Sequence, residues 1–324
     1  MGDPTCSTHG WSILDSAPTN SSLAGVLAGF GFTAAVIYVG RRDQAFDDGC
    51  DDPQQVTRHQ MARSVQDVQT ISLFVVSFII LGLDSFVWST IAGSRGSSVP
   101  REAVGLTPEL CSRVWSQAIL AAGMLSLGAI AMVCNITSLF LWQQSAVRDW
   151  HSRRYLRFFL LVATAIAVLG TTLYVASDSM NYLDVVYNGH PPVWLTTTTA
   201  VITFGGLAFA LVIGAHAYFR KPAPPTSAGA LKLKDRMKIP TLLVAFYVLI
   251  GAVGVTAAAR FPNWSPKPNT WVILVYWALG LVYPVVVVIL VARAVPPANS
   301  VGGIRPPTGV PQQQPDSDQD VIRR

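Results

Sequence analysis

One acidic residue stands inside a long apolar run of this sequence. Asp84 lies within the segment 70–92, which contains no other Asp, Glu, Lys or Arg. A charged side chain is costly inside a membrane helix, and where one occurs it commonly serves a function. Asp84 is therefore the first residue to consider for binding or catalysis.

Two further residues share the face of Asp84 if the segment is helical. Ser77 comes seven residues before it and Trp88 four residues after it, spacings that place the three side chains on one side of a helix. Ser85 and Ser89 adjoin the same side. The sequence thus predicts a polar stripe pointing into a bundle, with Ser77, Asp84 and Trp88 as ligand-binding residues.

Functional and structural roles are both open for Asp84. As a functional group, its carboxylate would accept a proton or attract a cation inside a cavity. As a structural group, it would pair with Arg113 or Arg95 near the outer surface, or stay protonated and bond to a neighbouring helix. The sequence offers no second carboxylate that we expect within the membrane, so a cooperating acid–base pair is not predicted.

The cysteines and acidic clusters carry weaker signals. Of four cysteines, Cys6 and Cys111 are both expected outside the membrane, so these two alone could form a disulfide; two free thiols are the alternative. Cys50 lies in the acidic stretch 47–52. This stretch lacks the residue spacing of a calcium-binding loop, so we expect it to form a solvated turn. We expect no metal site, and no motif indicates a cofactor.

The composition identifies the environment of these residues. The chain has 324 residues, of which 51% are hydrophobic and only 13% charged, about half the charged share of soluble proteins. The mean hydropathy is +0.42. A soluble or disordered chain would need more charge and fewer apolar residues. The composition therefore predicts an all-helical integral membrane protein.

Seven segments are long and apolar enough to cross a bilayer, which requires about 20 residues each. They are 23–40, 70–92, 114–142, 156–176, 194–219, 239–259 and 271–293. We expect a seven-helix domain over 23–293, preceded by an extracytoplasmic N-terminus at 1–22. A tail at 294–324, rich in Pro, Gln, Gly and Asp, is predicted to be disordered in the cytoplasm.

The basic residues predict the orientation. Eighteen of the 23 Lys and Arg residues fall in 41–69, 143–157, 220–238 and the chain after 292, at and between the ends of the spans on one side. Basic loops stay in the cytoplasm, so the N-terminus should be outside and the C-terminus inside. The basic loops would meet the anionic inner leaflet of the plasma membrane, so the lipid bilayer is the expected partner and nucleic acid is not.

Seven spans with the N-terminus outside is also the arrangement of microbial rhodopsins and of G-protein-coupled receptors. The likeness is limited to this topology. All five lysines lie outside the seventh span, which excludes a retinal Schiff base there. The sequence Val282-Tyr283-Pro284 is not the receptors' seventh-helix motif.

Three functions remain open at this point. The first is a non-enzymatic bundle that binds, senses or transports a small apolar or cationic molecule. The second is an intramembrane enzyme, such as a cyclase or transferase acting on a lipid-like substrate, with Asp84 as the acid. The third is a structural subunit that associates with a membrane-protein partner or with copies of itself.

Overall fold

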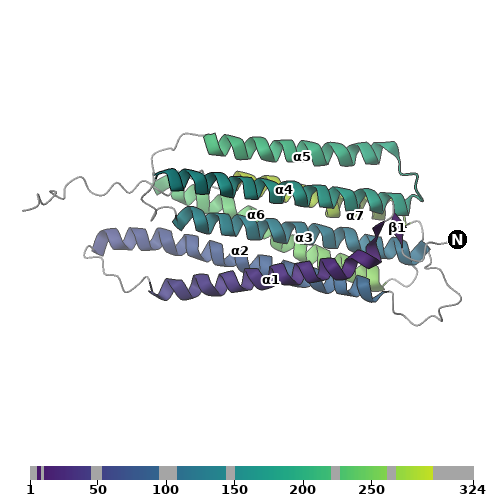
Figure 1. Cartoon of the computed structure of the whole chain (residues 1–324), viewed down its shortest axis with the longest axis horizontal. Coiled ribbons are helices and arrows are strands. Elements are labelled where there is room, and N and C mark those ends of the chain that lie inside the picture. The colour runs from purple at the N-terminus through teal and green to yellow at the C-terminus, as the bar shows by residue number, and fades with distance from the viewer. Residues whose placement is uncertain are drawn as a thin grey trace, which may run out of the picture.

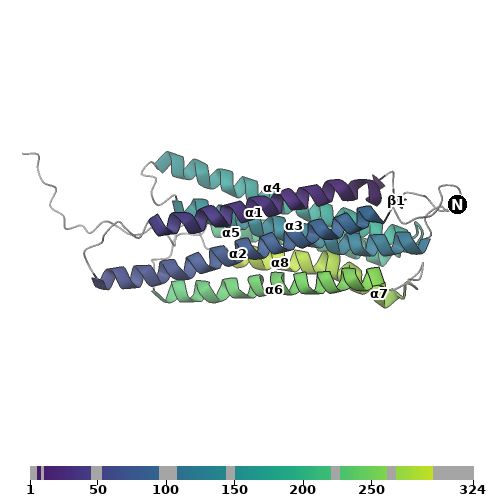
Figure 2. The same cartoon turned by 90° about the horizontal axis from the view of Figure 1, so that it is seen from below.

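The protein forms one bundle of long helices in a computed structural model that describes residues 6–8, 11–44, 53–94, 108–143, 150–219, 227–260 and 268–294. The helices run side by side along the long axis of the molecule (Figures 1 and 2). They are α1 (Ile13–Gln44), α2 (Pro53–Gly93), α3 (Pro108–Gln143), α4 (Trp150–Val186), α5 (Val193–Phe219), α6 (Ser227–Arg260), α7 (Thr270–Trp277), η2 (Ala278–Val282) and α8 (Tyr283–Ala294).

The structure confirms an all-helical chain with seven candidate membrane spans. By length and composition these are Ile13–Ile37, Ile71–Gly93, Leu110–Thr137, Val162–Val186, Val193–Ile213, Leu242–Ala259 and Thr270–Leu290. The only strands in the described residues are β1 (Ser7–Thr8) and β2 (Trp11–Ser12), an antiparallel pair in which Ser7 faces Ser12. This hairpin precedes α1, and we call the end of the bundle where it lies the hairpin end.

Helix α3 is the central element of the bundle. Nearly all its side chains from Cys111 to Met132 are buried, and it packs against α1, α2, α4, α6, α7, η2 and α8. It lies between its neighbours in both views of the molecule (Figures 1 and 2). Because the helix is shielded along most of its length, it also buries polar side chains, among them Ser116, Gln117 and Ser126.

The seventh span contains a π-helical turn next to a proline. Pro284 has no N–H to donate four residues back, and the N–H of Tyr283 bonds instead to the carbonyl of Ala278, five residues back. At Gly280 this turn approaches α3 so closely that a Cβ would overlap the side chain of Ile119. The proline and the glycine together allow the last span to pack against the centre of the bundle.

The helices are longer than the predicted spans, and two of the extensions lie at the hairpin end. The first starts at Ile13 rather than at 23, since Ser12 accepts the backbone N–H of Asp15 and Ile13, Leu14 and Ala17 are buried. The fourth continues to Val186, ten residues beyond the predicted end at 176. Both extensions contain polar residues that face other helices instead of water, which is why hydropathy alone assigned them to loops.

Candidate functional site: two buried carboxyl groups

Asp84 lies on the face of α2 that packs into the bundle. Its side chain is fully buried, as are those of Phe74, Ser77, Leu81, Trp88 and Ile91, which recur with the helical period on either side of it. Within the described part of the chain, neither carboxylate oxygen of Asp84 accepts a hydrogen bond. The carboxyl group therefore sits in an apolar setting with its acceptor capacity unused.

The two residues predicted to accompany Asp84 have different surroundings. Ser77 donates a 2.9 Å hydrogen bond to the carbonyl oxygen of Gly128 in α3, which makes it a contact between helices. Trp88 is fully buried one turn beyond Asp84. Its indole N–H interacts with the carboxyl group but is not placed well enough for a hydrogen bond, and it has no other described acceptor.

Arg113 is not a hydrogen-bond partner of Asp84. The arginine is partly buried near the start of α3, and no hydrogen bond joins its guanidinium to either oxygen of Asp84 in the described residues. Arg95, the other cation considered as a partner, lies outside the described residues. The structure thus gives Asp84 no described partner of opposite charge.

A second carboxyl group is buried in the same bundle, contrary to the prediction that the membrane holds only one. Asp178 was assigned to a loop at 177–193, but it lies inside α4 and is 1% exposed. Neither of its oxygens accepts a hydrogen bond from a described residue. The correction follows from the length of α4, which carries Asp178 and the neighbouring Ser179 two helical turns below its end.

Both carboxyl groups lie at one level of the bundle. Asp84 comes nine residues before the end of α2 and Asp178 eight residues before the end of α4, which corresponds to about 13 Å and about 12 Å along each helix. Both of these helices end near the hairpin end and pack against α3. The two carboxyl groups therefore occupy the half of the bundle nearest the hairpin.

Tyr174 lies one turn before Asp178 on α4, where its hydroxyl interacts with the carboxyl group of Asp178, and it is within electrostatic range of Asp84. Its hydroxyl oxygen accepts a 3.1 Å hydrogen bond from the side-chain amide of Asn20 in α1. Side chains from three helices thus meet in a polar layer within an apolar bundle.

Tyr182 extends this layer toward the hairpin end. It lies one turn beyond Asp178 and is fully buried. Its hydroxyl interacts with the side chain of Ser116 in α3 but makes no hydrogen bond within the described residues. The spacing Tyr174, Asp178, Tyr182 repeats every four residues, and this repeat was the sequence signal that would have placed Asp178 on a helix facing the bundle.

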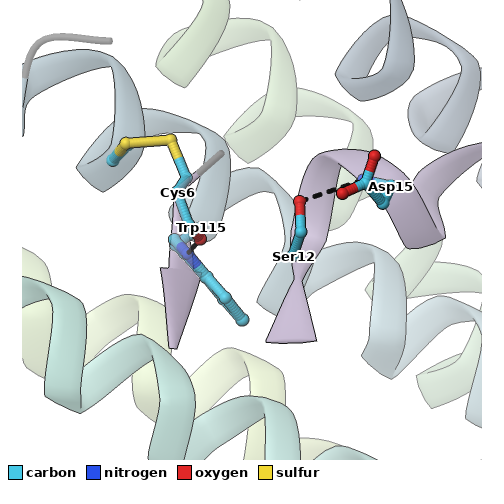
Figure 3. The surroundings of a disulfide bond; sticks show 5 residues. Cys6, Ser12, Asp15 and Trp115 are labelled. Carbon is cyan, nitrogen blue, oxygen red and sulfur yellow. Dashed lines mark hydrogen bonds between the residues drawn. A yellow bond between two sulfur atoms is a disulfide. The ribbon is translucent and has the colours of Figure 1, made fainter. Parts of the chain in front are cut away.

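A disulfide joins the hairpin to the central helix. Cys6 is bonded to Cys111, with their Cα atoms 5.3 Å apart, and the indole N–H of Trp115 donates a 3.1 Å hydrogen bond to the carbonyl of Cys6 (Figure 3). Trp11 packs edge-on against Trp115 with ring centroids 5.9 Å apart. These contacts hold the hairpin against the end of the bundle nearest the two carboxyl groups.

The energetics of the polar layer limit what it can do. Taking an ionised carboxylate out of water costs on the order of several kcal/mol unless a cation or hydrogen-bond donors compensate. Among the described residues, no hydrogen bond of good geometry reaches Asp84 or Asp178, although the indole of Trp88 interacts with Asp84 and the hydroxyl of Tyr174 interacts with Asp178. Nor do three His, Cys, Asp or Glu side chains come together anywhere in the described ranges to hold a metal ion. A site of this kind is suited to taking up positive charge.

No protein family, curated protein or solved structure matches the chain. The fold itself defines a class: an all-helical, multi-pass membrane protein with seven candidate spans, in contact with a lipid bilayer.

Proposed function

We propose that the protein binds a small cation at Asp84 and Asp178 and, through this site, transports or senses that cation at the plasma membrane. The observation that carries the proposal is the pair of buried carboxyl groups whose four oxygens accept no hydrogen bond from the described residues. A bound cation would supply the missing countercharge. Tyr174 would stay within electrostatic reach of both carboxyl groups.

The charge distribution supports an orientation for this site. Eighteen of the 23 basic residues fall in 41–69, 143–157, 220–238 and after 292, the parts of the sequence that adjoin the helix ends opposite the hairpin. By the positive-inside rule that end faces the cytoplasm and the hairpin end faces outward. The cation would then be bound in the outer half of the bundle, beneath the disulfide-linked hairpin.

The test is thermal unfolding of the purified protein in detergent with probe cations. Sodium, potassium, tetraphenylphosphonium and protons are titrated separately. Binding to the folded state alone stabilises it by about 2.7 kcal/mol at a hundred times the dissociation constant, so the midpoint should rise with at least one of them. Asp84→Asn and Asp178→Asn should abolish the rise.

Asp184→Asn is the matched control for this test. Asp184 lies on α4 near its end and is partly exposed, so the same substitution should leave the response to the cation intact. A protein whose unfolding responds to none of the four probes would contradict the proposal. Uptake of the effective cation into proteoliposomes then separates transport from sensing.

A second candidate function is acid–base catalysis inside the membrane. Asp178 supplies the second carboxyl group that general acid–base chemistry commonly uses, and Tyr174 adds a phenol at the same level. An intramembrane cyclase or transferase acting on a lipid-like substrate would use one carboxyl as the acid. Conversion of an added isoprenoid or phospholipid by purified protein, lost in both Asn variants, would favour this function over cation binding.

A further inference from the structure

We propose that the N-terminal hairpin is a cap on the bundle and that the disulfide between Cys6 and Cys111 is its latch, so that reduction by a dithiol opens a path toward the polar layer. The cap segment comprises residues 6–8 and 11–17, which are β1, β2 and the first turn of α1. This inference rests on the proposed function for its use, because it names how access to that site is regulated.

The cap segment covers the ends of three helices. Ile91 lies two residues before the end of α2, Val114 lies near the start of α3, and Val186 is the last residue of α4. All three side chains are buried, and they belong to one apolar cluster with Cys6 and Ile13 of the cap segment. The cap segment therefore shields the end of the bundle nearest the two carboxyl groups (Figures 1 and 2).

Three contacts fasten the cap segment to α3, and one of them is covalent. Besides the disulfide, the indole N–H of Trp115 donates a 3.1 Å hydrogen bond to the carbonyl of Cys6, and Trp11 packs edge-on against the Trp115 ring (Figure 3). The strand β1 also packs against α4. Because the other contacts are single and non-covalent, the disulfide is the contact that decides whether the cap segment stays closed.

Pro18 supplies a hinge behind the cap segment. It lies inside α1 and has no N–H to donate to the carbonyl of Leu14, so the helix is weakened at this point. Just beyond it, the hydroxyl of Ser21 donates to the carbonyl of Ser85 in α2 and the hydroxyl of Ser85 donates to the carbonyl of Ser21, both at 2.9 Å. The rest of α1 is therefore held against α2 when the cap segment moves.

Two features of the cap segment favour its release once the latch is cut. Cys6 has a φ of 48°, in the left-handed region, which residues other than Gly adopt only where surrounding contacts impose it. The hydroxyl of Thr8 is buried without a hydrogen bond to a described residue, which is unfavourable until water reaches it. The buried side chains of Ile13 and Leu14 oppose release, so the reduced cap segment opens and closes without detaching.

The latch opens by thiol–disulfide exchange with a dithiol. A thiolate of the dithiol attacks the Sγ atom of Cys111, which is 9% exposed against 3% for Cys6. The bond between the two protein sulfurs breaks, and Cys6 leaves as a thiolate that takes up the proton lost by the attacking thiol. The second thiol of the dithiol then attacks the mixed disulfide and its proton passes to Cys111. The dithiol departs as a disulfide, having given two electrons and two protons to the protein.

The opened cap segment leads toward the polar layer. Trp115 and Ser116 are fully buried at the start of α3, and the side chain of Ser116 interacts with the hydroxyl of Tyr182 in α4. Asp178 lies one helical turn further into the bundle on α4. Lifting the cap segment from Trp115 therefore admits water and small solutes beside Ser116, at the edge of the site.

Thiol labelling of the purified protein tests the cap. Ser116→Cys introduces a thiol beneath the cap segment in a background with Cys50 and Cys134 replaced by Ser and Ala. Its reaction with a small maleimide is compared between this protein and the same protein carrying Cys6→Ala and Cys111→Ala. Modification follows the population of the open form, so the rate should rise at least about tenfold when the latch is absent. Peptide mapping checks that Cys6 and Cys111 remain linked in the first protein.

Ser126→Cys is the matched control for the labelling. Ser126 lies on the same helix and is also buried, but it is further from the cap segment and donates to the carbonyl of Thr171 in α4 at 3.2 Å. A thiol at this position should react equally slowly with and without the latch. Acceleration at Ser116→Cys alone supports the cap.

Hydrogen–deuterium exchange of the wild type needs no introduced thiol and decides the matter if Ser116→Cys does not fold. Addition of dithiothreitol should speed exchange of the amides in 111–116 and 182–186 at least about tenfold, because local opening limits their exchange. Amides in 126–132 should be unaffected. Cys134→Ala, which removes a thiol outside the latch, should respond as the wild type does. Reoxidation with oxidised glutathione should restore slow exchange.

The outcomes separate this inference from the proposed function. Unchanged labelling and exchange without the latch would overturn the cap and leave the disulfide as a structural crosslink. Equal acceleration at both labelled positions would also overturn it, because the whole bundle would then have loosened. Neither result bears on cation binding, which thermal unfolding with the four probes measures separately. A cap that opens as described in a protein that responds to none of the probes would leave the latch standing and remove the proposed function.

Discussion

The side-chain amide of Asn20 donates a 3.1 Å hydrogen bond to the hydroxyl of Tyr174, 154 residues later in the chain. This bond ties α1 to α4 and positions the phenol that interacts with both buried carboxyl groups. It connects the first helix, which starts beneath the hairpin, to the polar layer in the half of the bundle nearest the hairpin. Substitution of Asn20 or Tyr174 therefore tests the stability of the fold and the geometry of the site together.

Removing either partner of this bond should destabilise the protein. We expect Asn20→Ala and Tyr174→Phe each to lower the free energy of unfolding by about 1 kcal/mol, the net worth of a typical hydrogen bond. The double mutant should lose less than the sum, with a coupling of about 0.5 kcal/mol or more. Ser22→Ala is the control, because within the described part of the chain the Ser22 hydroxyl bonds to the carbonyl of Pro18 in its own helix. Additive losses would mean that the bond does not form.

Asp84 and Arg113 should show no coupling. The sequence left open a structural ion pair between them, and the structure contains no hydrogen bond between their side chains. Asp84→Asn, Arg113→Gln and the double mutant should therefore give additive changes in melting, within about 0.5 kcal/mol. A coupling above about 1 kcal/mol would show that Asp84 and Arg113 form an ion pair. Asp84 would then be a structural residue and not part of the candidate site.

The spans were predictable from the sequence because an apolar run of about 20 residues has few alternatives to a membrane helix. Asp178 was not, because the window that contains it is diluted by Ser177, Ser179 and Asn181, and hydropathy does not report which way a residue faces. Ser77 was correctly placed on the face of Asp84, but its bond to Gly128 depends on how α2 is rotated against α3. Such pairings depend on tertiary packing, which one sequence does not specify.

The disulfide between Cys6 and Cys111 should be detectable in the intact protein. Non-reducing peptide mapping should recover Cys6 and Cys111 in one linked fragment, with Cys134 free. The bond closes a loop with a sequence separation of 105 residues. In the chain-entropy description such a loop stabilises by about 4–5 kcal/mol, so reductant should lower the melting midpoint of the wild type. The midpoint of Cys6→Ala should be insensitive to reductant; recovery of both thiols free in the wild type would contradict the bond.

Cysteine labelling in intact cells tests the orientation. In a variant with Cys50 and Cys134 replaced by Ser and Ala, His190→Cys introduces a thiol at an exposed position of the turn between α4 and α5. It should react with an impermeant maleimide, whereas Ser227→Cys, at the start of α6 on the basic side, should react only after the cells are permeabilised. The reverse pattern would place the two carboxyl groups in the half of the bundle that faces the cytoplasm.

The final prediction separates a functional from a structural role for the two carboxyl groups. Asn is nearly isosteric with Asp and carries no charge, so Asp84→Asn and Asp178→Asn remove the cost of burying a carboxylate while keeping the packing. If the carboxyls serve function, both variants should fold and melt at or above the wild-type midpoint, with a gain of up to about 1–3 kcal/mol. Both should lose the stabilisation that the bound cation provides, as followed by melting with and without the effective probe. If instead each variant melts lower by about 1–3 kcal/mol and still responds to the cation, the carboxyls are structural acceptors. In that case Asp84 and Asp178 hold the helices together, and the site that binds the cation must be sought elsewhere in the chain.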